Sequence, residues 1–260
     1  MSMRFCSLGS GSEGNALVVE VGRGASKSRV MMDCGFGIRE TEHRLTRVGL
    51  APNDIDAIVV THEHSDHIGG VARIARKYGI PVWLTHGTAK VLSKQAIPST
   101  LIRYIDPHQK FSVGDIEVTP YTVPHDAYEP VQFVFSDGAS RVGVLTDVGT
   151  TTQHIEDCLS ACQALVLEAN HDLAMLIAGP YPQSLKLRVS GKFGHLDNAA
   201  AAGLLARLRH PSLRHVIAAH LSRQNNTREL AQSAFAEVLG CTPAEVGIAG
   251  QDDGFDWRAL

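Results

Sequence analysis

Apolar runs with the composition of β-strands recur along this 260-residue chain, and several of them stop at an aspartate or a histidine. The residues at these stops are Asp33, His62, His125, Asp147 and His220. Strand ends in a packed sheet are rigid positions, and side chains from several of them can meet at one edge of the sheet. We therefore expect this edge to hold a functional site.

The same pattern predicts the remaining organisation. Strands are predicted over 17–21, 29–32, 55–60, 81–85, 111–123, 131–135, 141–146, 163–167 and 215–219. Helices are predicted over 71–78, from the cap Asp197 to residue 209, and from the cap Asn226 to Gly240. Because helices lie between several strands and no Pro- or Ser-rich linker interrupts the chain, residues 1–260 are expected to form a single α/β domain.

Composition excludes some classes of protein. Lys and Arg number 24 against 27 Asp and Glu, a net charge of −3, which excludes binding of nucleic acid by bulk positive charge. The longest apolar stretch, 199–206, is far shorter than the ~18 residues of a membrane span. The five cysteines form no C-x-x-C pair. With no secretory signal at the amino terminus, we expect reduced thiols and a cytoplasmic protein without a membrane partner.

Residues 61–67, Thr-His-Glu-His-Ser-Asp-His, are the most informative segment for function. Protonated histidines this close together repel one another, whereas neutral imidazole and carboxylate are natural metal ligands. If His62 and His64 extend from a strand end, their side chains point the same way. Asp66 and His67 then begin the next turn and can face a second ion. The segment predicts a metal site rather than an exposed polar loop.

This H-x-H-x-D-H segment resembles the signature of the metallo-β-lactamase superfamily, and the resemblance covers nearly the whole chain. It implies a four-layer αββα sandwich with two divalent ions, zinc or manganese with iron as a further option, at the sheet edge. It also implies two ligand groups, a bridging carboxylate and a supporting carboxylate. These are His62, His64 and His125; Asp66, His67 and His220; Asp147 as the bridge; and Asp33 as the support.

The completeness of this ligand set indicates hydrolysis, with a metal-bridging hydroxide as the nucleophile. Asp66 and His195 are the candidate catalytic residues. His195, in the segment 194–198, is similar to the extra histidine of the superfamily's phosphodiesterases. An alkoxide leaving group needs a proton, so we expect His195 to act as a general acid. Asp197 either orients that ring or caps the helix that follows.

Further segments resemble the WalJ (YycJ) group of bacterial metallo-β-lactamase-fold proteins. They lie at 7–15, 124–127, 167–172, 179–182, 194–196 and 220–223. The resemblance implies a cytoplasmic nuclease, with 5′ exonuclease action on single-stranded or end-exposed DNA. The short interval between Asp147 and His220 leaves no room for the β-CASP insertion of related nucleases that cleave messenger RNA.

Residues that contact the substrate are harder to predict. The Gly/Ser-rich segment 7–15 is either a flexible turn or an anion-binding loop, and it lacks the Gly-Lys-Ser/Thr of a P-loop. Basic residues near the ligands form either a solvated face or a track for the phosphate backbone. The candidates are Ser10, Ser12, Asn15, Asn170, His171, Tyr181, Lys186, Arg188 and Arg223.

Two other functions compete with a nuclease. A small-molecule hydrolase of the same fold, acting on a cyclic phosphodiester, lactone or thioester, is favoured by the net acidity and the 6% aromatic content. A non-catalytic binding module is disfavoured by the complete ligand set. The sequence leaves the choice of ion, the polarity of digestion and the oligomeric state open.

Overall fold

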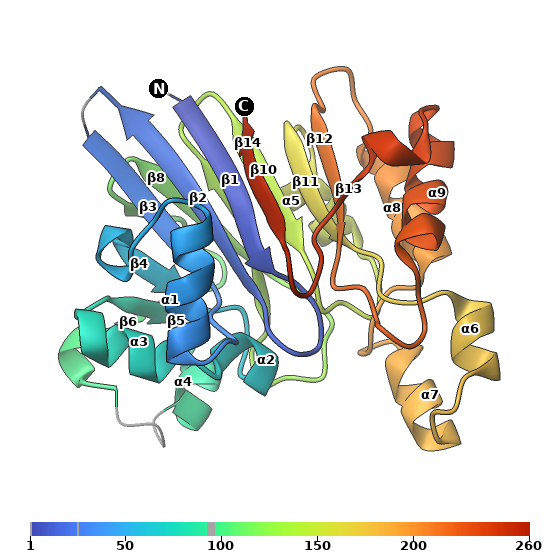
Figure 1. Ribbon diagram of the computed structural model, residues 1–260, viewed down its shortest axis with the longest axis horizontal. Coiled ribbons are helices and arrows are strands. Elements are labelled where there is room, and N and C mark those ends of the chain that lie inside the picture. The colour runs from blue at the N-terminus through green and yellow to red at the C-terminus, as the bar shows by residue number, and fades with distance from the viewer. Residues whose placement is uncertain (1, 25, 93–96) are drawn as a thin grey trace.

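Two seven-stranded sheets pack face to face, and helices cover the outer side of each sheet (Figure 1). The structure is a computed structural model that describes residues 2–24, 26–92 and 97–260. Both termini lie at the top of this view, whereas the loop after β1 and the short helix α2 lie near the bottom. In the ranges described, no helix combines the length and apolar character needed to cross a membrane.

The first sheet has the strand order β14-β1-β2-β3-β4-β5-β6. Its strands are β1 (Ser2–Gly9), β2 (Ala16–Arg23), β3 (Ser26–Met32), β4 (Ala57–Val59), β5 (Val82–Leu84), β6 (Ile102–Tyr104) and β14 (Phe255–Ala259). Pairing is antiparallel from β14 to β3 and parallel from β3 to β6. The helices on this side are α1 (Ile38–Arg47), α2 (Ser65–Ile68), α3 (Val71–Tyr78) and α4 (His86–Leu92).

The second sheet has the strand order β13-β12-β11-β10-β9-β8-β7. Its strands are β7 (Phe111–Val113), β8 (Ile116–Thr122), β9 (Val131–Ser136), β10 (Arg141–Leu145), β11 (Ala164–Glu168), β12 (His215–Ala219) and β13 (Gly247–Ile248). The helices that connect the later strands of this sheet are α5 (Gln153–Leu159), α6 (Leu173–Ala178), α7 (Gln183–Val189), α8 (Asn198–Leu208) and α9 (Arg228–Leu239). Helices α8 and α9 cover the sheet, whereas α6 and α7 lie beyond its edge at the lower right of Figure 1. Short 3-10 turns occupy Pro52–Asp54, Ser99–Leu101 and Pro243–Glu245.

Three apolar layers hold these elements together. The central layer joins the inner faces of both sheets, with Val19 and Val166 among its members. One outer layer packs the first sheet against α1, α3 and α4, and includes Ile74. The other packs the second sheet against α5, α8 and α9, and includes Phe235. Since strands buried on both faces alternate between two cores, this arrangement confirms the predicted αββα sandwich.

Local predictions were wrong where one residue redirects the chain. The single strand predicted over 111–123 is two strands, because Gly114 adopts a left-handed φ of +56° and turns the chain. The predicted cap Asn226 is instead buried, and its amide donates to the carbonyl oxygen of Ala169. Thr227 therefore caps α9, accepting the backbone N–H of Leu230. Asp197 caps α8 as expected.

A cluster of charges on the first sheet links three strands. Glu20 of β2 lies between Arg4 of β1 and Arg29 of β3, and each arginine Nε donates to its carboxylate at 2.7 Å. Lys27 Nζ lies 3.3 Å from the same carboxylate. Burial alone raises the pKa of Glu20, but the hydrogen bonds from these three cations outweigh it and lower the pKa to about 2.

The Glu20 cluster should make stability depend on pH in acid. The carboxylate titrates near 4.5 when unfolded and near 2 when folded, so its contribution is full above pH 4.5 and is lost as the pH falls toward 2. The whole shift corresponds to about 3 kcal/mol, and solvent screening of the partly exposed Arg4 and Lys27 reduces the expected value to ~2 kcal/mol. Glu20→Gln should therefore lower the free energy of unfolding by that amount at pH 7, measured by urea denaturation.

The difference in the free energy of unfolding between Glu20→Gln and the parent protein should become steadily smaller as the pH falls from 4.5 to 2. Glu117→Gln is the matched control, because Glu117 pairs with Lys110 in solvent and such pairs contribute little. An equal destabilisation at pH 7 and pH 2.5 would contradict this account of the cluster.

Candidate metal centre

The loops that follow the strands converge on one edge of the sandwich, as the pattern of strand ends predicts. Three residues at these ends have left-handed backbones: Asp33 with φ 59°, Asp147 with φ 54° and His220 with φ 54°. For a residue other than glycine this conformation costs roughly 1–2 kcal/mol and persists only where its surroundings hold it. The strain at these three residues makes this edge a candidate functional site.

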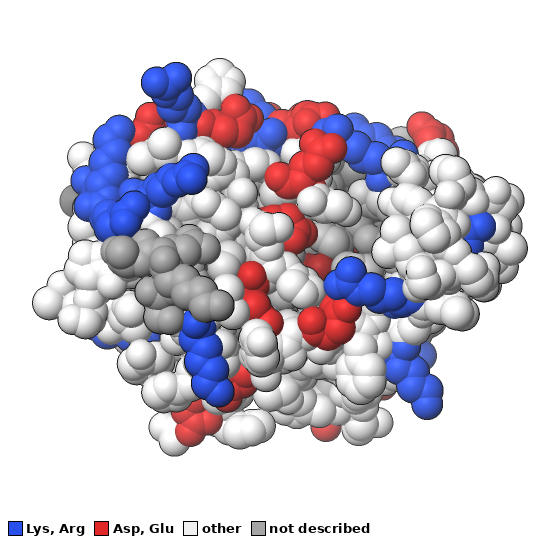
Figure 2. All heavy atoms as spheres, turned by 90° about the horizontal axis from the view of Figure 1, so that it is seen from below, with Lys and Arg blue, Asp and Glu red and all other residues white. Residues whose placement is uncertain are grey.

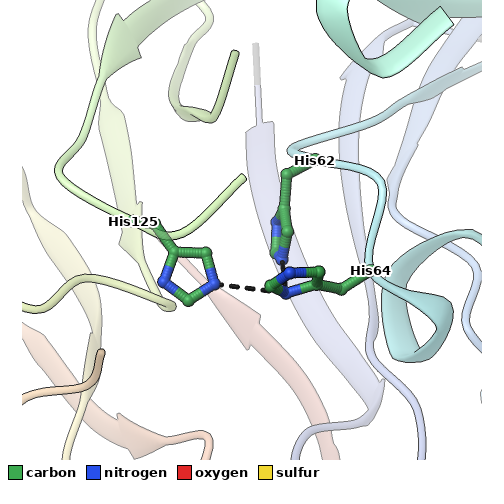
Figure 3. A group of neighbouring side chains, drawn as sticks. All are labelled: His62, His64 and His125. Atoms are coloured by element: carbon green, nitrogen blue, oxygen red, sulfur yellow. Dashed lines mark hydrogen bonds between the residues drawn. The ribbon is translucent and has the colours of Figure 1, made fainter. Parts of the chain in front are cut away.

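Three histidines form the first ligand group. In Figure 3, His62, His64 and His125 point toward one another from two separate loops. His64 Nδ1 lies 3.0 Å from His62 Nε2 and 3.3 Å from His125 Nε2. Burial, together with the neighbouring histidines, lowers the pKa of His62 well below its ordinary value, and burial lowers that of His125. These shifts favour the neutral form of His62 and His125, which is the form that binds a metal ion.

The second group lies beside the first. It contains Asp66, His67, Asp147 and His220. His67 Nε2 lies 3.2 Å from Asp147 Oδ2, and His220 Nε2 lies 3.5 Å from Asp147 Oδ1. Asp147 Oδ1 is also 3.9 Å from His125 Nε2 in the first group. Asp147 thus lies between the two groups, at the position that the sequence predicts for a bridging carboxylate.

Asp33 orients the His67 ring from behind. Its fully buried carboxylate lies 2.8 Å from His67 Nδ1 and accepts hydrogen bonds from the backbone N–H and the hydroxyl of Thr61. Burial raises the pKa of Asp33, and the contacts with His67 and Thr61 oppose that effect. Thr61 Oγ1 in turn lies 3.0 Å from His62 Nδ1. These contacts leave Nε2 of both histidines facing the site.

Glu168 orients the rings of His195 and His220, as Asp33 orients that of His67. Glu168 is not among the site residues predicted from the sequence. Its buried carboxylate lies 2.8 Å from His195 Nδ1 and 3.2 Å from His220 Nδ1. It also accepts the backbone N–H groups of Asp147, Val148 and Leu196. Burial raises the pKa of Glu168, but the two histidines outweigh it and lower the pKa to about 2. The indication in the sequence was its place after the strand 163–167, like that of Asp33 after 29–32.

The structure places His195 beside the metal-ligand groups. Its ring stacks on His220 with centroids 5.3 Å apart, and Nδ1 lies 3.8 Å from Asp147 Oδ1. Burial lowers the pKa of His195, and the Glu168 and Asp147 carboxylates raise it above its ordinary value. Because Nδ1 donates to Glu168, Nε2 is the nitrogen left for proton exchange with a bound molecule.

The chemistry of the donor set fits metal binding. Among the described residues, Asp147 Oδ2 and His220 Nε2 are buried side-chain atoms without a hydrogen-bond partner. Such atoms are costly in a protein interior unless an ion binds them. A mixture of neutral imidazole and carboxylate suits divalent zinc, manganese or iron. The site can therefore bind metal.

Some predicted substrate residues lie under the site instead of facing outward. Ser10 Oγ accepts the backbone N–H of His220 at 3.0 Å. The amide of Asn15 lies 3.3 Å from Asp66 Oδ2, and Asn170 Nδ2 donates to the carbonyl oxygen of His220. These three residues and His171 are buried. Their contacts hold the ligand loops in place, and phosphate binding by them remains a prediction.

Most of the predicted basic track is engaged in ion pairs and hydrogen bonds. Arg188 Nε donates to Asp126 Oδ2 at 2.6 Å. The Arg223 guanidinium pairs with carboxylates of the loops before β2 and before β14. Lys186 Nζ donates to the carbonyl oxygen of Ile177. These contacts favour local recognition of phosphate over a continuous basic track, in keeping with the acidic side chains at the centre of the face in Figure 2.

A cavity of about 400 Å³ opens beside the two ligand groups. One wall includes His64, Asp66, Asp147, His195 and His220. The remainder of the lining includes three predicted substrate residues, Ser12, Tyr181 and Arg188. Members of both candidate ligand groups and His195 therefore face the same space.

Known proteins are similar to this chain in sequence and in fold. A family model described as "Beta-lactamase superfamily domain" matches residues 28–221. The chain is 36% identical to exodeoxyribonuclease YycJ of Bacillus anthracis, over 92% of this chain and 90% of that protein. It is 30% identical to exodeoxyribonuclease WalJ of Streptococcus pneumoniae serotype 2, over 95% and 92% of the two chains.

Solved structures agree with these sequence relationships. The metallo-β-lactamase fold protein YhfI from Bacillus subtilis superposes with a TM-score of 0.75, at 15% identity, over 100% of this chain and 99% of that chain. At this identity the likeness shows the fold alone, whereas the sequence relationships are closer and span both chains. The chain therefore belongs to the metallo-β-lactamase superfamily and, within it, to the family that includes YycJ and WalJ.

Proposed function

We propose that this protein is a dinuclear metal-dependent phosphodiesterase that degrades DNA from the 5′ end of a single-stranded or exposed terminus. The observation that supports this most strongly is the shared cavity, onto which both metal-ligand groups and His195 open. The names of the relatives YycJ and WalJ, both exodeoxyribonucleases, agree with it. As in the sequence-based expectation, we place this activity in the cytoplasm.

Two ions, zinc or manganese, would bind at the two ligand groups. His62, His64 and His125 would hold one, and Asp66, His67 and His220 the other, with Asp147 between them. When bound, divalent ions lower the pKa of water and neutralise charge that develops on a phosphate. Asp33 and Glu168 hold the outer nitrogens of His67 and His220, which keeps the ligand atoms aimed inward.

His195 supplies a proton to the departing oxygen. The Glu168 carboxylate accepts from Nδ1, and its negative charge stabilises the imidazolium form of the ring. Nε2 then carries the proton that the leaving group needs. Asp66 lines the same cavity as this ring, and its carboxylate takes part in orienting the attacking water.

The small cavity also suits the alternative of a small phosphodiester, since sites of ~300–1,000 Å³ typically take small molecules. Assays of the metal-loaded protein on 5′-phosphorylated oligonucleotides and on bis(p-nitrophenyl) phosphate separate the two functions. Hydrolysis of the small diester alone would replace the nuclease proposal with this alternative.

His195→Ala tests the proposed general acid. We expect cleavage of oligonucleotides to fall by about 10²- to 10⁴-fold, since this is the contribution typical of general acid catalysis. Metal content, measured by elemental analysis, should stay unchanged. His43→Ala, on the exposed face of α1, is the control and should keep full activity. Loss of metal from His195→Ala would instead assign this histidine to the metal site.

Asp33→Asn tests the support of the ligand groups. Replacing the carboxylate behind His67 should weaken metal binding by about 10- to 100-fold, as loss of a ligand's hydrogen-bond partner typically does. Competition with a chelator measures the affinity, and elemental analysis of the parent protein should find two ions per chain. Asp256→Asn, exposed on β14, is the matched control. Unchanged affinity in Asp33→Asn would show that this carboxylate does not support the metal site.

A further inference from the structure

Helices α6 and α7 form an arm, residues 173–189, that stands outside the three apolar layers. The buried members of those layers, among the residues described, include none from this arm. No residue of α7 is buried, and Ile177 and Leu187 expose more than half of their side chains. Leu176 of α6 is buried, but burial gives no account of the exposed apolar residues in the arm.

The arm nevertheless faces the proposed active site. Tyr181, between α6 and α7, and Leu185 and Val189 of α7 line the 400 Å³ cavity together with several of the predicted metal ligands. The cavity thus has one wall of imidazoles and carboxylates and another of an aromatic ring and aliphatic side chains. A molecule that fills it needs an anionic part and an apolar, planar part.

An ion pair joins α7 to the loop that follows β8. Arg188 of α7 donates to Asp126, which directly follows His125 in the chain, at 2.6 Å. This contact holds the apolar wall against the loop that bears a predicted metal ligand. Because Arg188 is paired with Asp126, the arm presents mainly apolar side chains to the cavity. The surface at the right of Figure 2 is largely uncharged.

We propose that Tyr181, Leu185 and Val189 form a subsite for the base of one unpaired nucleotide, whose phosphate lies at the opposite wall. This rests on the proposed function and deepens it by naming the unit that the site accepts. Every base has a face that stacks on an aromatic ring, so such a subsite tolerates any sequence. The volume lies within the range of small-ligand sites, which suits a single nucleotide.

Binding of mononucleotides tests the subsite without relying on catalysis. The manganese-loaded protein is titrated calorimetrically with dAMP, TMP and 2-deoxyribose 5-phosphate, which has the phosphate but no base. We expect both nucleotides to bind about tenfold more tightly than the sugar phosphate, since stacking of one base typically contributes an affinity gain of this order. Equal affinity for all three ligands would overturn the proposal.

Variants of the arm test whether Tyr181 causes the tighter binding of nucleotides. Tyr181→Ala should reduce the preference for dAMP over the sugar phosphate to about twofold, while Tyr181→Phe keeps the ring and should retain it. Leu187→Ala truncates an apolar residue that is 64% exposed and is not among the residues lining the cavity, so it should bind like the parent. A full preference in Tyr181→Ala would also overturn the proposal.

Oligonucleotide cleavage, measured on the same preparations, keeps this inference distinct from the proposed function. Preference for nucleotides without any cleavage would support the subsite and contradict the nuclease. Cleavage without any preference for nucleotides would support the nuclease and contradict the subsite.

Discussion

The whole site depends on carboxylates that are buried next to histidines. Asp33, Asp147 and Glu168 are each at most 2% exposed, and an unpaired charge at such a depth is strongly destabilising. Each carboxylate faces at least one imidazole, and two of them also accept backbone N–H groups. The negative charge of Asp147, with the contacts from Asp66 and Glu168, raises the pKa of His220 to about 10 despite its burial. The protein interior is therefore organised around charges that divalent ions would balance.

The remainder of the chain keeps these charges in place. Asn15 contacts the 61–67 segment through its backbone and its amide, and Ser10 holds the backbone of His220. The loop containing both residues is fixed in turn by Arg44 of α1, which donates to the carbonyl oxygens of Leu8 and Gln251. Segments from both ends of the sequence thus support the strained strand ends, which explains how left-handed conformations persist there.

The buried strands and helices of this protein are predicted well from the sequence, because buried elements have regular patterns of apolar residues. The strand 215–219 and the helix 71–78 have the same bounds in the structure. Strand β1 was not predicted, since its serines and the glycines after it resemble a turn. Its pairing partners, β2 and the distant β14, decide its conformation, and such long-range pairing leaves no local pattern.

The candidate site shows the same division between local and long-range information. The residues of the two candidate ligand groups lie close together in the structure, and His125, Asp147 and His220 each follow an apolar strand. Glu168 follows one as well, but a lone glutamate lacks the chemical distinctiveness of clustered histidines. The side-chain partners of Arg188 and Arg223 depend on loops far away in the sequence. Their positive charges therefore suggested a track for phosphate where the structure has ion pairs.

These ion pairs change how an acidic protein can recognise DNA. With most of the predicted cations neutralised, attraction between this face and a phosphate backbone is weak, and bound ions become the main local positive charge. Recognition must then combine a phosphate at the ions with apolar contact to the adjoining base. An aromatic and aliphatic wall held against the metal site by Arg188 and Asp126 meets that requirement. The same geometry favours a strand end over the middle of a duplex, because an unpaired base leaves its stack to reach these side chains at a lower energetic cost than a paired base.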